Sequence, residues 1–199
     1  PKMPIVGVDG KEPNDLFRKQ LVASAKAAVD VLVEKGIADK DKIAIAGHSY
    51  GAFMVANLLA HSDLFKTGIA RSGAYNRTLT QFGFQGEERD FWQAQDVYAN
   101  MSPFFHAEKI NEPMLMIHGQ EDPNSGTFPM QSERMYAALK GLGKEARLVM
   151  LPYEAHGYRA RKSLLHVLWE QEQWLEKYLL SDEAPVSDAQ ANTEPSVSE

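Results

Sequence analysis

One serine lies where a nucleophile would be placed by the surrounding chain. The stretch GHSYG, residues 47–51, follows a short apolar run and precedes a helical pattern over residues 52–60. A tight turn between strand and helix holds a serine hydroxyl above the sheet, and small flanking residues let the two elements pack closely. Ser49 is therefore the predicted nucleophile. The backbone N–H of Tyr50 is the predicted donor to an oxyanion.

A serine hydroxyl needs a general base, and the base needs an orienting carboxylate. Asp122 follows the apolar run PMLMIH in the loop HGQEDPNSG, and His156 follows ARLVMLP in the loop YEAHGY. The order Ser, Asp, His, with acid and base each in a loop after a strand, is typical of α/β-hydrolases. Asp122 and His156 are therefore predicted to complete a catalytic triad with Ser49. Such a triad performs acyl transfer and requires no cofactor.

Other residues compete for the roles of acid and base. Glu121 adjoins Asp122, and Glu154 lies two residues before His156, so either is an alternative acid. The remaining histidines are interpreted as packing or surface hydrogen-bonding residues: His48, His61, His106, His118 and His166. No two of these have the helical spacing of metal ligands, so we expect no metal site. The chain has no cysteine, which excludes thiolate catalysis and disulfides.

The elements that must position these residues alternate along the chain. Helical periodicity runs from Asn14, the predicted N-cap, to Gly36. Strands are predicted at residues 42–46, 67–71, 113–118 and 146–151, and further helices at residues 52–60, 128–139 and 159–180. This alternation predicts βαβ units and a parallel sheet, that is, an α/β fold. Residues 72–109 are rich in aromatics and are expected to form an ordered excursion.

Acidic residues are concentrated at the C-terminal end. The net charge is −6, but the residues from Ser181 on contain five carboxylates and no Lys or Arg. We expect residues 1–180 to form a partial α/β-hydrolase domain and residues 181–199 to be a disordered acidic tail. The nearly neutral remainder has no basic surplus for nucleic acid or an anionic membrane. Its longest apolar stretches are only strand-length, so no membrane span is expected.

The first predicted strand is poorly protected. An α/β-hydrolase core has more strands than the four predicted here, and the apolar segment KIAIA (residues 42–46) would form an unpaired edge. The chain also starts without an initiator Met or a targeting pattern. We therefore expect it to be the C-terminal part of a hydrolase domain, with the N-terminal strands of the sheet missing.

Several blocks of sequence carry a family resemblance. GHSYGAFM, HGQEDPNSGTFPMQSERMYAALKGLG, LVMLPYEAHGY and the final WEQEQWLEKYL resemble the hydrolase domain of the prolyl oligopeptidase family, from about Asp15 to Leu180. The segment GIARSGAYNRTLTQFGF is most similar to the glutamyl endopeptidase branch. The resemblance implies a serine peptidase with Ser49 as nucleophile, Asp122 as orienting acid and His156 as general acid and base. It also implies a preceding β-propeller and preceding hydrolase strands, with a loop that supplies a second oxyanion donor.

In this fold, the segment after the strand that follows the elbow lines the substrate pocket. A substrate carboxylate is best bound by arginine, which forms two parallel hydrogen bonds with it. Arg71, at the end of the strand after the elbow, and Arg77, beyond it, are the predicted binders of an acidic side chain, and Arg77 is favoured because it lies further from the strand in a polar loop. The alternative is that both are surface or ion-paired residues, with Glu87, Glu88 or Asp90 as partners, and Arg159 and Arg161 are reserve candidates. The predicted function is peptide hydrolysis, possible alternatives being a carboxylesterase-type hydrolase or a non-catalytic fragment of the parent peptidase.

Overall fold

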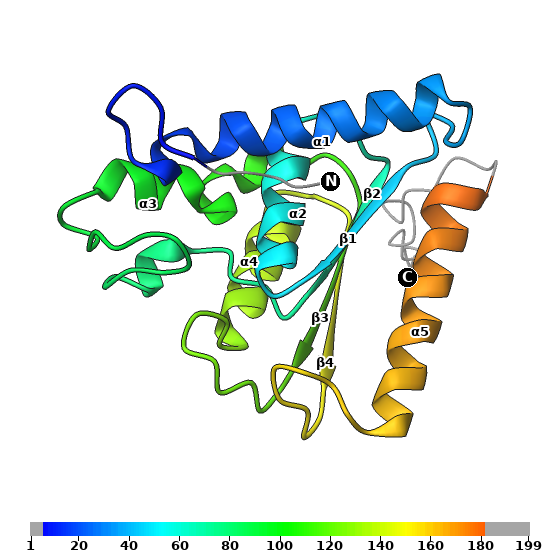
Figure 1. The fold of residues 1–199 in the computed structure, drawn as a ribbon. Coiled ribbons are helices and arrows are strands. Elements are labelled where there is room, and N and C mark those ends of the chain that lie inside the picture. Colours follow the sequence, from blue (N-terminus) through cyan, green and yellow to red (C-terminus); the bar gives the residue numbers. More distant parts are fainter. Residues whose placement is uncertain (1–5, 182–199) are drawn as a thin grey trace, which may run out of the picture.

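A parallel four-stranded sheet organises residues 6–181, the part of the chain that the computed structural model describes (Figure 1). Its strands lie in the order β1 (Ala44–His48), β2 (Thr67–Arg71), β3 (Met114–Gly119) and β4 (Ala146–Leu151). All three pairs of neighbours are parallel. The predicted parallel α/β sheet is confirmed. β1 begins two residues later than predicted and extends to His48, so the strand leads directly into Ser49.

Helices cover the sheet on both faces. They are α1 (Phe17–Glu34), α2 (Tyr50–His61), α3 (Gln95–Met101), α4 (Met130–Gly141) and α5 (Arg161–Leu175), with short turns η1 (Pro13–Leu16), η2 (Arg77–Leu79) and η3 (Pro103–Lys109) and a π-helical end η4 (Glu176–Leu180). α5 lies alone on one side of the strands, whereas α2 and α4 lie on the other (Figure 1). No described helix is long and apolar enough to cross a membrane.

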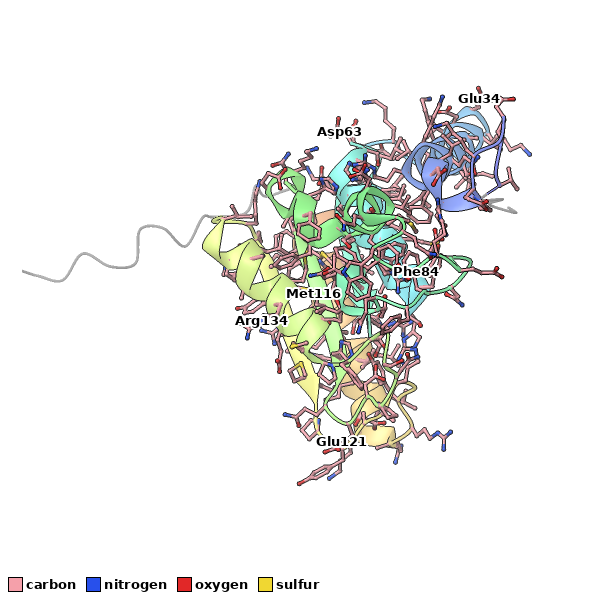
Figure 2. All side chains as sticks on the ribbon, turned by 90° about the vertical axis from the view of Figure 1, so that its left-hand side faces the viewer. Glu34, Asp63, Phe84, Met116, Glu121 and Arg134 are labelled. Carbon is pink, nitrogen blue, oxygen red and sulfur yellow. The ribbon has the colours of Figure 1, made fainter. Side chains whose placement is uncertain are left out.

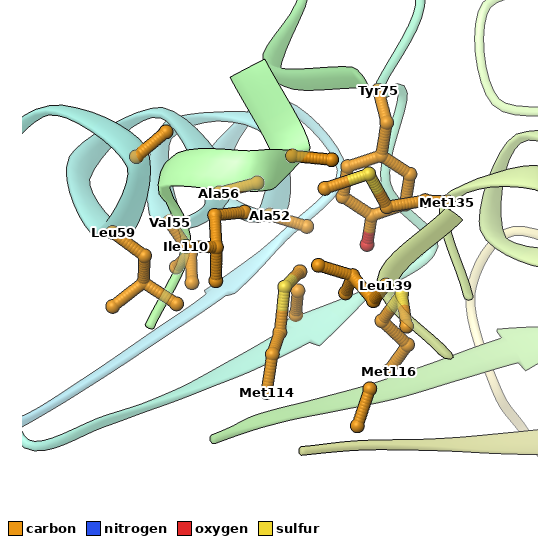
Figure 3. Packing of buried hydrophobic residues seen from close by; sticks show 14 residues of the cluster. Ala52, Val55, Ala56, Leu59, Tyr75, Ile110, Met114, Met116, Met135 and Leu139 are labelled. Atoms are coloured by element: carbon orange, nitrogen blue, oxygen red, sulfur yellow. The ribbon is translucent and has the colours of Figure 1, made fainter. Parts of the chain in front are cut away.

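Side chains of β3 alternate between the two faces and thereby build two cores. Met114 and Met116 pack with side chains of α2 and α4 in the cluster of Figure 3. Leu115 and Ile117 point the other way and contact the buried side of α5. These β3 residues are almost fully buried, and each such side chain contributes about 1.5–3 kcal/mol to the free energy of folding. The strand that precedes the Asp122 loop is therefore the best-anchored strand of the sheet.

Asn14 differs from its predicted role as N-cap. It lies inside η1, and the α-helix begins only at Phe17 without a side-chain cap. The Asn14 amide instead donates to the carbonyl of Gly86 (2.8 Å) and to Glu87 Oε2 (3.2 Å). The N-cap prediction was wrong because a contact more than seventy residues away in sequence uses the side chain that local reasoning assigned to the helix.

The excursion between β2 and β3 is ordered, as expected, although it contains only short elements. Tyr98 of α3 is fully buried, and its hydroxyl donates to the carbonyl of Arg89 (2.7 Å) and accepts from the N–H of Gly83 (2.8 Å). One buried tyrosine thus fixes two points of an irregular loop. The predicted acidic tail lies outside the described residues, except for Ser181.

Candidate active site

Ser49 occupies a strained turn between β1 and α2. Its φ is 59° and its ψ is −118°, a conformation that a non-glycine residue adopts only when its surroundings enforce it. The N–H of Ser49 donates to the carbonyl of Arg71 (2.8 Å), which ties the turn to β2. A Cβ at Gly47 would lie 2.3 Å from the backbone of Gly51, whereas a Cβ at Gly51 would meet nothing. The close approach therefore requires a glycine at position 47.

The three residues predicted as a triad meet in space. His156 Nε2 lies 2.8 Å from Ser49 Oγ, and His156 Nδ1 lies 2.8 Å from Asp122 Oδ2. The carboxylate accepts the proton on Nδ1, which leaves Nε2 free to accept the hydroxyl proton of Ser49. His156 is 107 positions from Ser49 and 34 positions from Asp122 in the sequence. The three residues nevertheless form one hydrogen-bonded chain with the geometry of an activated nucleophile.

Asp122 is almost completely enclosed, with 3% of its surface exposed. Its Oδ1 accepts from the N–H of Asn124 (2.9 Å), and its Oδ2 accepts from the hydroxyl of Thr127 (3.0 Å) in addition to His156. Burial by itself would raise the pKa of this carboxyl group. The hydrogen bonds from His156, Asn124 and Thr127 outweigh burial and hold the pKa below its ordinary value. Asp122 therefore carries a negative charge beside the imidazole at neutral pH.

The two rival carboxylates lie elsewhere. Glu121 is exposed at the outer end of the loop (Figure 2). Glu154 is buried, but its carboxylate accepts from the backbone N–H groups of Arg159 (2.7 Å) and Ala160 (2.9 Å). Since Ala160 is the N-cap residue of α5, the Glu154 carboxylate stabilises the N-terminus of that helix. Among the three carboxylates, Asp122 is the one that contacts His156.

The other histidines have separate surroundings. The ring of His48 packs against the ring of His156 at 5.0 Å, and that of His166 stacks on Trp169. His61 and His106 lie against each other and against the guanidinium of Arg18. Within residues 6–181, no group of three or more His, Cys, Asp or Glu could hold a metal ion.

His118 is the histidine whose position sequence reasoning missed. It is completely buried, and its Nε2 lies 3.1 Å from Asp122 Oδ2. The available signal was its place near the end of an apolar strand, four residues before the predicted acid. That spacing brings the two side chains together because the chain turns back immediately after β3.

A cavity of about 530 Å³ opens beside Ser49. Its wall comes from the elbow, from the excursion after β2 and from the loop after Asp122: Ser49, Tyr50, Ala74, Arg77, Leu79, Thr80, Gln81, Phe82, Gly83, Phe84, Gln85, Asn124, Ser125, Gly126 and Thr127. Phe84, labelled in Figure 2, and Phe82 give part of this wall an apolar character. The cavity is large enough for one amino-acid side chain next to the nucleophile.

Arg77 is the cationic residue of this cavity wall. It is 5% exposed, and its guanidinium lies over the rings of Phe53 (4.2 Å), Phe84 (4.8 Å) and Tyr50 (5.6 Å). No carboxylate within residues 6–181 forms an ion pair with it, and its buried Nε has no hydrogen-bond partner there. Burial lowers the pKa of Arg77 to about 10, so the group remains charged at neutral pH.

The other candidate arginines are not part of this wall. Arg71, at the end of β2, also has a buried Nε without a partner in the described part of the chain, but it does not line the cavity. Arg159 and Arg161 are exposed and do not line it either. The proposed ion pair of Arg77 with Glu87 is not formed, because Glu87 binds Arg89 (2.7 Å). The sequence analysis favoured Arg77 over the other three arginines, and Arg77 is the one of the four that lines the cavity.

A buried glutamine connects the Arg77 segment to α4. Gln131 Oε1 accepts from the N–H groups of Tyr75 (2.9 Å) and Asn76 (2.8 Å), and its Nε2 donates to the carbonyl of Asn76 (3.0 Å). The N–H of Arg77 itself donates to Ser102 Oγ (2.7 Å). These four bonds hold the backbone beneath Arg77 in one position relative to the loop that carries Asp122.

Comparison with known proteins agrees with this geometry. The model of the prolyl oligopeptidase family matches residues 17–182. The chain is 57% identical over 197 residues to a probable chloroplastic glutamyl endopeptidase of Arabidopsis thaliana and 58% identical over 196 residues to one of Oryza sativa. These alignments cover 98% of the chain but only 20% and 21% of the two relatives. The chain thus spans about a fifth of the length of these curated relatives.

Solved structures extend the comparison to the fold. A puromycin-hydrolysing peptidase of Mycobacterium tuberculosis superposes with a TM-score of 0.72 at 26% identity, covering 80% of this chain and 25% of that one. An acylaminoacyl peptidase of Pyrococcus horikoshii superposes with a TM-score of 0.64 at 30% identity, covering 79% of this chain and 27% of that one. The fold is therefore that of an α/β-hydrolase, as the sequence predicted.

Proposed function

Because this chain belongs to the prolyl oligopeptidase family, we propose that it carries the catalytic residues of a serine peptidase. The observation that supports this most strongly is the position of His156, which bridges Ser49 Oγ and Asp122 Oδ2 at 2.8 Å each. A serine hydroxyl, an imidazole and a buried carboxylate in this order form an acyl-transfer site. The family, rather than the triad itself, directs the proposal to peptide bonds.

The reaction proceeds through an acyl-enzyme. His156 Nε2 takes the proton of Ser49 as Oγ attacks the peptide carbonyl carbon, and the carbonyl oxygen becomes an oxyanion. The N–H of Tyr50 stabilises that oxyanion, since the first N–H groups of a helix have no partner within it and Tyr50 begins α2. The imidazolium then gives its proton to the leaving amine. A water molecule, deprotonated by His156, releases the acyl group and restores Ser49.

The cavity selects a glutamate side chain on the acyl side of the scissile bond. Arg77 supplies a buried cation whose hydrogen-bonding capacity is not used by a carboxylate of residues 6–181. A substrate carboxylate would neutralise it and accept two parallel N–H bonds. The rings of Phe53 and Phe84 hold the guanidinium, and Phe84, which lines the cavity, packs the methylene groups of the substrate side chain. The two plant relatives, which carry the name glutamyl endopeptidase, agree with this selection.

Other parts of the peptidase complete the site. β1 pairs only with β2 within the described residues, and its Ala46 is exposed at that edge. We infer that hydrolase strands of the same polypeptide cover this edge and that a loop among them gives the second oxyanion donor, with a propeller as a further part. Open edges of this kind are protected in native proteins.

Mapping of cleavage sites tests the proposed function. The full-length protein is incubated with a mixture of unstructured peptides, and the new termini are identified by mass spectrometry. The expected result is a set of products that end in glutamate. Products that end mainly in proline or alanine would refute the acidic pocket while leaving the peptidase intact, and an enzyme that cleaves only small esters would refute the peptidase.

A further inference from the structure

A second histidine, completely buried, contacts the same carboxylate oxygen of the triad as His156. His118 Nε2 lies 3.1 Å from Asp122 Oδ2 and 2.7 Å from the carbonyl oxygen of Thr127, while Nδ1 lies 2.6 Å from Ser132 Oγ. The imidazole is completely buried, so water cannot substitute for any of these partners. All polar atoms of the ring are used, and three of its contacts lead to the segment that holds the catalytic acid.

The contacts determine the tautomer of His118. A carbonyl oxygen only accepts, so the short contact with Thr127 places the proton on Nε2. That N–H is shared between the Thr127 carbonyl and Asp122 Oδ2, and Nδ1 accepts the hydroxyl proton of Ser132. Burial lowers the pKa of His118, and the nearby Asp122 offsets this only in part, so the ring is neutral at pH 7. The titratable groups that act on it are Asp122 and His156.

From this arrangement we propose that His118 is a positioning residue that holds Asp122 in place for His156. The proposal rests on the catalytic role proposed above for Asp122. Oδ2 accepts from His156, Thr127 and His118, so two groups besides the catalytic base fix its position. The imidazole of His118 also binds both ends of the turn, since it contacts the Asp122 side chain and the Thr127 backbone. Rotation of the carboxylate away from His156 would break these bonds in a site without water.

Loss of the His118 donor has a consequence that simple loosening of the loop does not have. A carboxylate with one hydrogen bond fewer retains more negative charge and stabilises the imidazolium form of His156 more strongly. The pH at which Ser49 becomes half-maximally reactive should therefore rise. A role in packing alone would lower reactivity at every pH and leave this midpoint where it was.

The test is the rate at which a fluorophosphonate modifies Ser49 in the full-length protein, followed between about pH 5 and 9. His118→Asn retains a polar group near Nδ1 but removes the donor at Nε2, whereas His118→Gln places an amide N–H near Nε2. We expect His118→Asn to slow modification about tenfold and to raise the pH midpoint, as is typical for loss of a group that orients a catalytic side chain. His118→Gln should restore most of both quantities.

A second variant keeps the test decisive if His118→Asn fails to fold. Ser132→Ala leaves the imidazole in place but removes the hydroxyl that donates to its Nδ1 and holds the ring, so a smaller rise of the midpoint is expected. Folded His118→Asn and Ser132→Ala proteins with the wild-type midpoint would overturn the proposal, and so would equal losses in the Asn and Gln variants. Failure of the proposed function looks different, because the wild-type protein would then be unmodified or modified at another serine.

Discussion

Asp122 and Arg77 are both buried charges beside Ser49, but the protein treats them in opposite ways. Asp122 is 3% exposed and accepts hydrogen bonds from Asn124, Thr127, His118 and His156. Arg77 is 5% exposed and, among the described residues, has aromatic rings around it instead of a carboxylate. A charge that its own fold neutralises is suited to orient a neighbour. A charge that has no counter-ion among the described residues is suited to bind a counter-ion that belongs to a ligand.

The difference also appears in the pKa values. Hydrogen bonds overcome burial at Asp122 and lower its pKa, which stabilises the ionised form. Burial dominates at Arg77 and lowers its pKa to about 10, which means that keeping the cation in this buried position costs free energy. A substrate carboxylate would remove that cost. On the proposed function, the Arg77 side of the cavity is therefore where binding free energy would distinguish between substrates.

Removal of the nucleophile, which the Asp122 and His156 pair orients, should have the largest effect on turnover. Ser49→Ala should lower peptide turnover by about 10⁶-fold, because the remaining triad residues have nothing to activate. The fold should be retained, since alanine adopts the Ser49 backbone conformation about as well as serine does. Steady-state turnover and a thermal melt measure the two effects. Ser125→Ala, another serine of the cavity wall, is the control and should stay active; equal losses in both variants would contradict the assignment.

Neutralising the acid should have the next largest effect. Asp122→Asn retains the shape of the side chain but can present an N–H to His156 Nδ1, which favours the wrong tautomer, and turnover should fall about 10⁴-fold. Glu121→Gln changes the adjacent, exposed carboxylate and should leave turnover almost unchanged. If the two variants lost activity to the same extent, the claim that the buried carboxylate is the acid would be wrong.

A smaller effect is expected from the support beneath Arg77. Gln131→Ala removes the acceptor of two backbone N–H groups and leaves them buried, which costs about 1–3 kcal/mol of stability. The preference for glutamate over glutamine in peptide substrates should fall roughly tenfold because Arg77 is less well positioned. A tenfold change corresponds to about 1.4 kcal/mol of binding free energy. Gln120→Ala, an exposed neighbour of the same loop region, is the control. An unchanged preference in a folded Gln131→Ala protein would show that this glutamine supports only stability.

Arg18 shows how a cation without a carboxylate partner in the described part of the chain can still be hydrogen-bonded. Its guanidinium contacts Nε2 of His61 (3.4 Å) and of His106 (3.3 Å) and donates to Asn100 (3.2 Å), all of which are neutral acceptors. Burial, followed by repulsion from Arg18 and His106, lowers the pKa of His61 to about 4. The unfolded chain, with a His pKa near 6.5, therefore takes up a proton first as the pH falls. The junction of α1 and α2 should lose stability below pH 6.5, with the loss complete near pH 4.

Hydrogen exchange of α1 amides, corrected for intrinsic rates, measures this loss. With allowance for the partial exposure of His61, protection should fall by about 1 kcal/mol more between pH 7.5 and 5.5 in wild type than in His61→Gln. His166→Gln, which alters an exposed histidine of α5, should behave as wild type. Equal pH dependence in wild type and His61→Gln would show that burial and Arg18 do not keep this histidine neutral.

The sequence was sufficient to predict the elements and residues with strong local signals. The elbow around Ser49 lies between a strand and a helix as predicted, and β3 and β4 deliver Asp122 and His156 from loops after apolar runs. These predictions succeeded because strand and helix periodicity, together with chain order, determines where strand ends meet in a parallel sheet.

Other features depend on contacts between distant segments. The side chain of Asn14 was assigned to a helix end, but it binds Gly86 and Glu87. His118 was assigned to packing, but the turn after β3 brings it onto Asp122. Arg77 was favoured over Arg71 because of its polar loop, but its place over the rings of Phe53 and Phe84 depends on an irregular path that no periodicity describes. Local patterns cannot reveal which polar partner a buried side chain finds.

A double-mutant cycle between enzyme and substrate tests the central claim most directly. The value of kcat/KM is measured for two peptides that differ only in glutamate or its isostere glutamine before the scissile bond, on wild type, Arg77→Met and Arg71→Met. We expect wild type and Arg71→Met to prefer glutamate by about 10²-fold, because loss of a buried charge pair typically costs at least about 3 kcal/mol. Arg77→Met should lose this preference. A preference that survives in Arg77→Met, or one that disappears in Arg71→Met instead, would contradict the account of the unpaired cation.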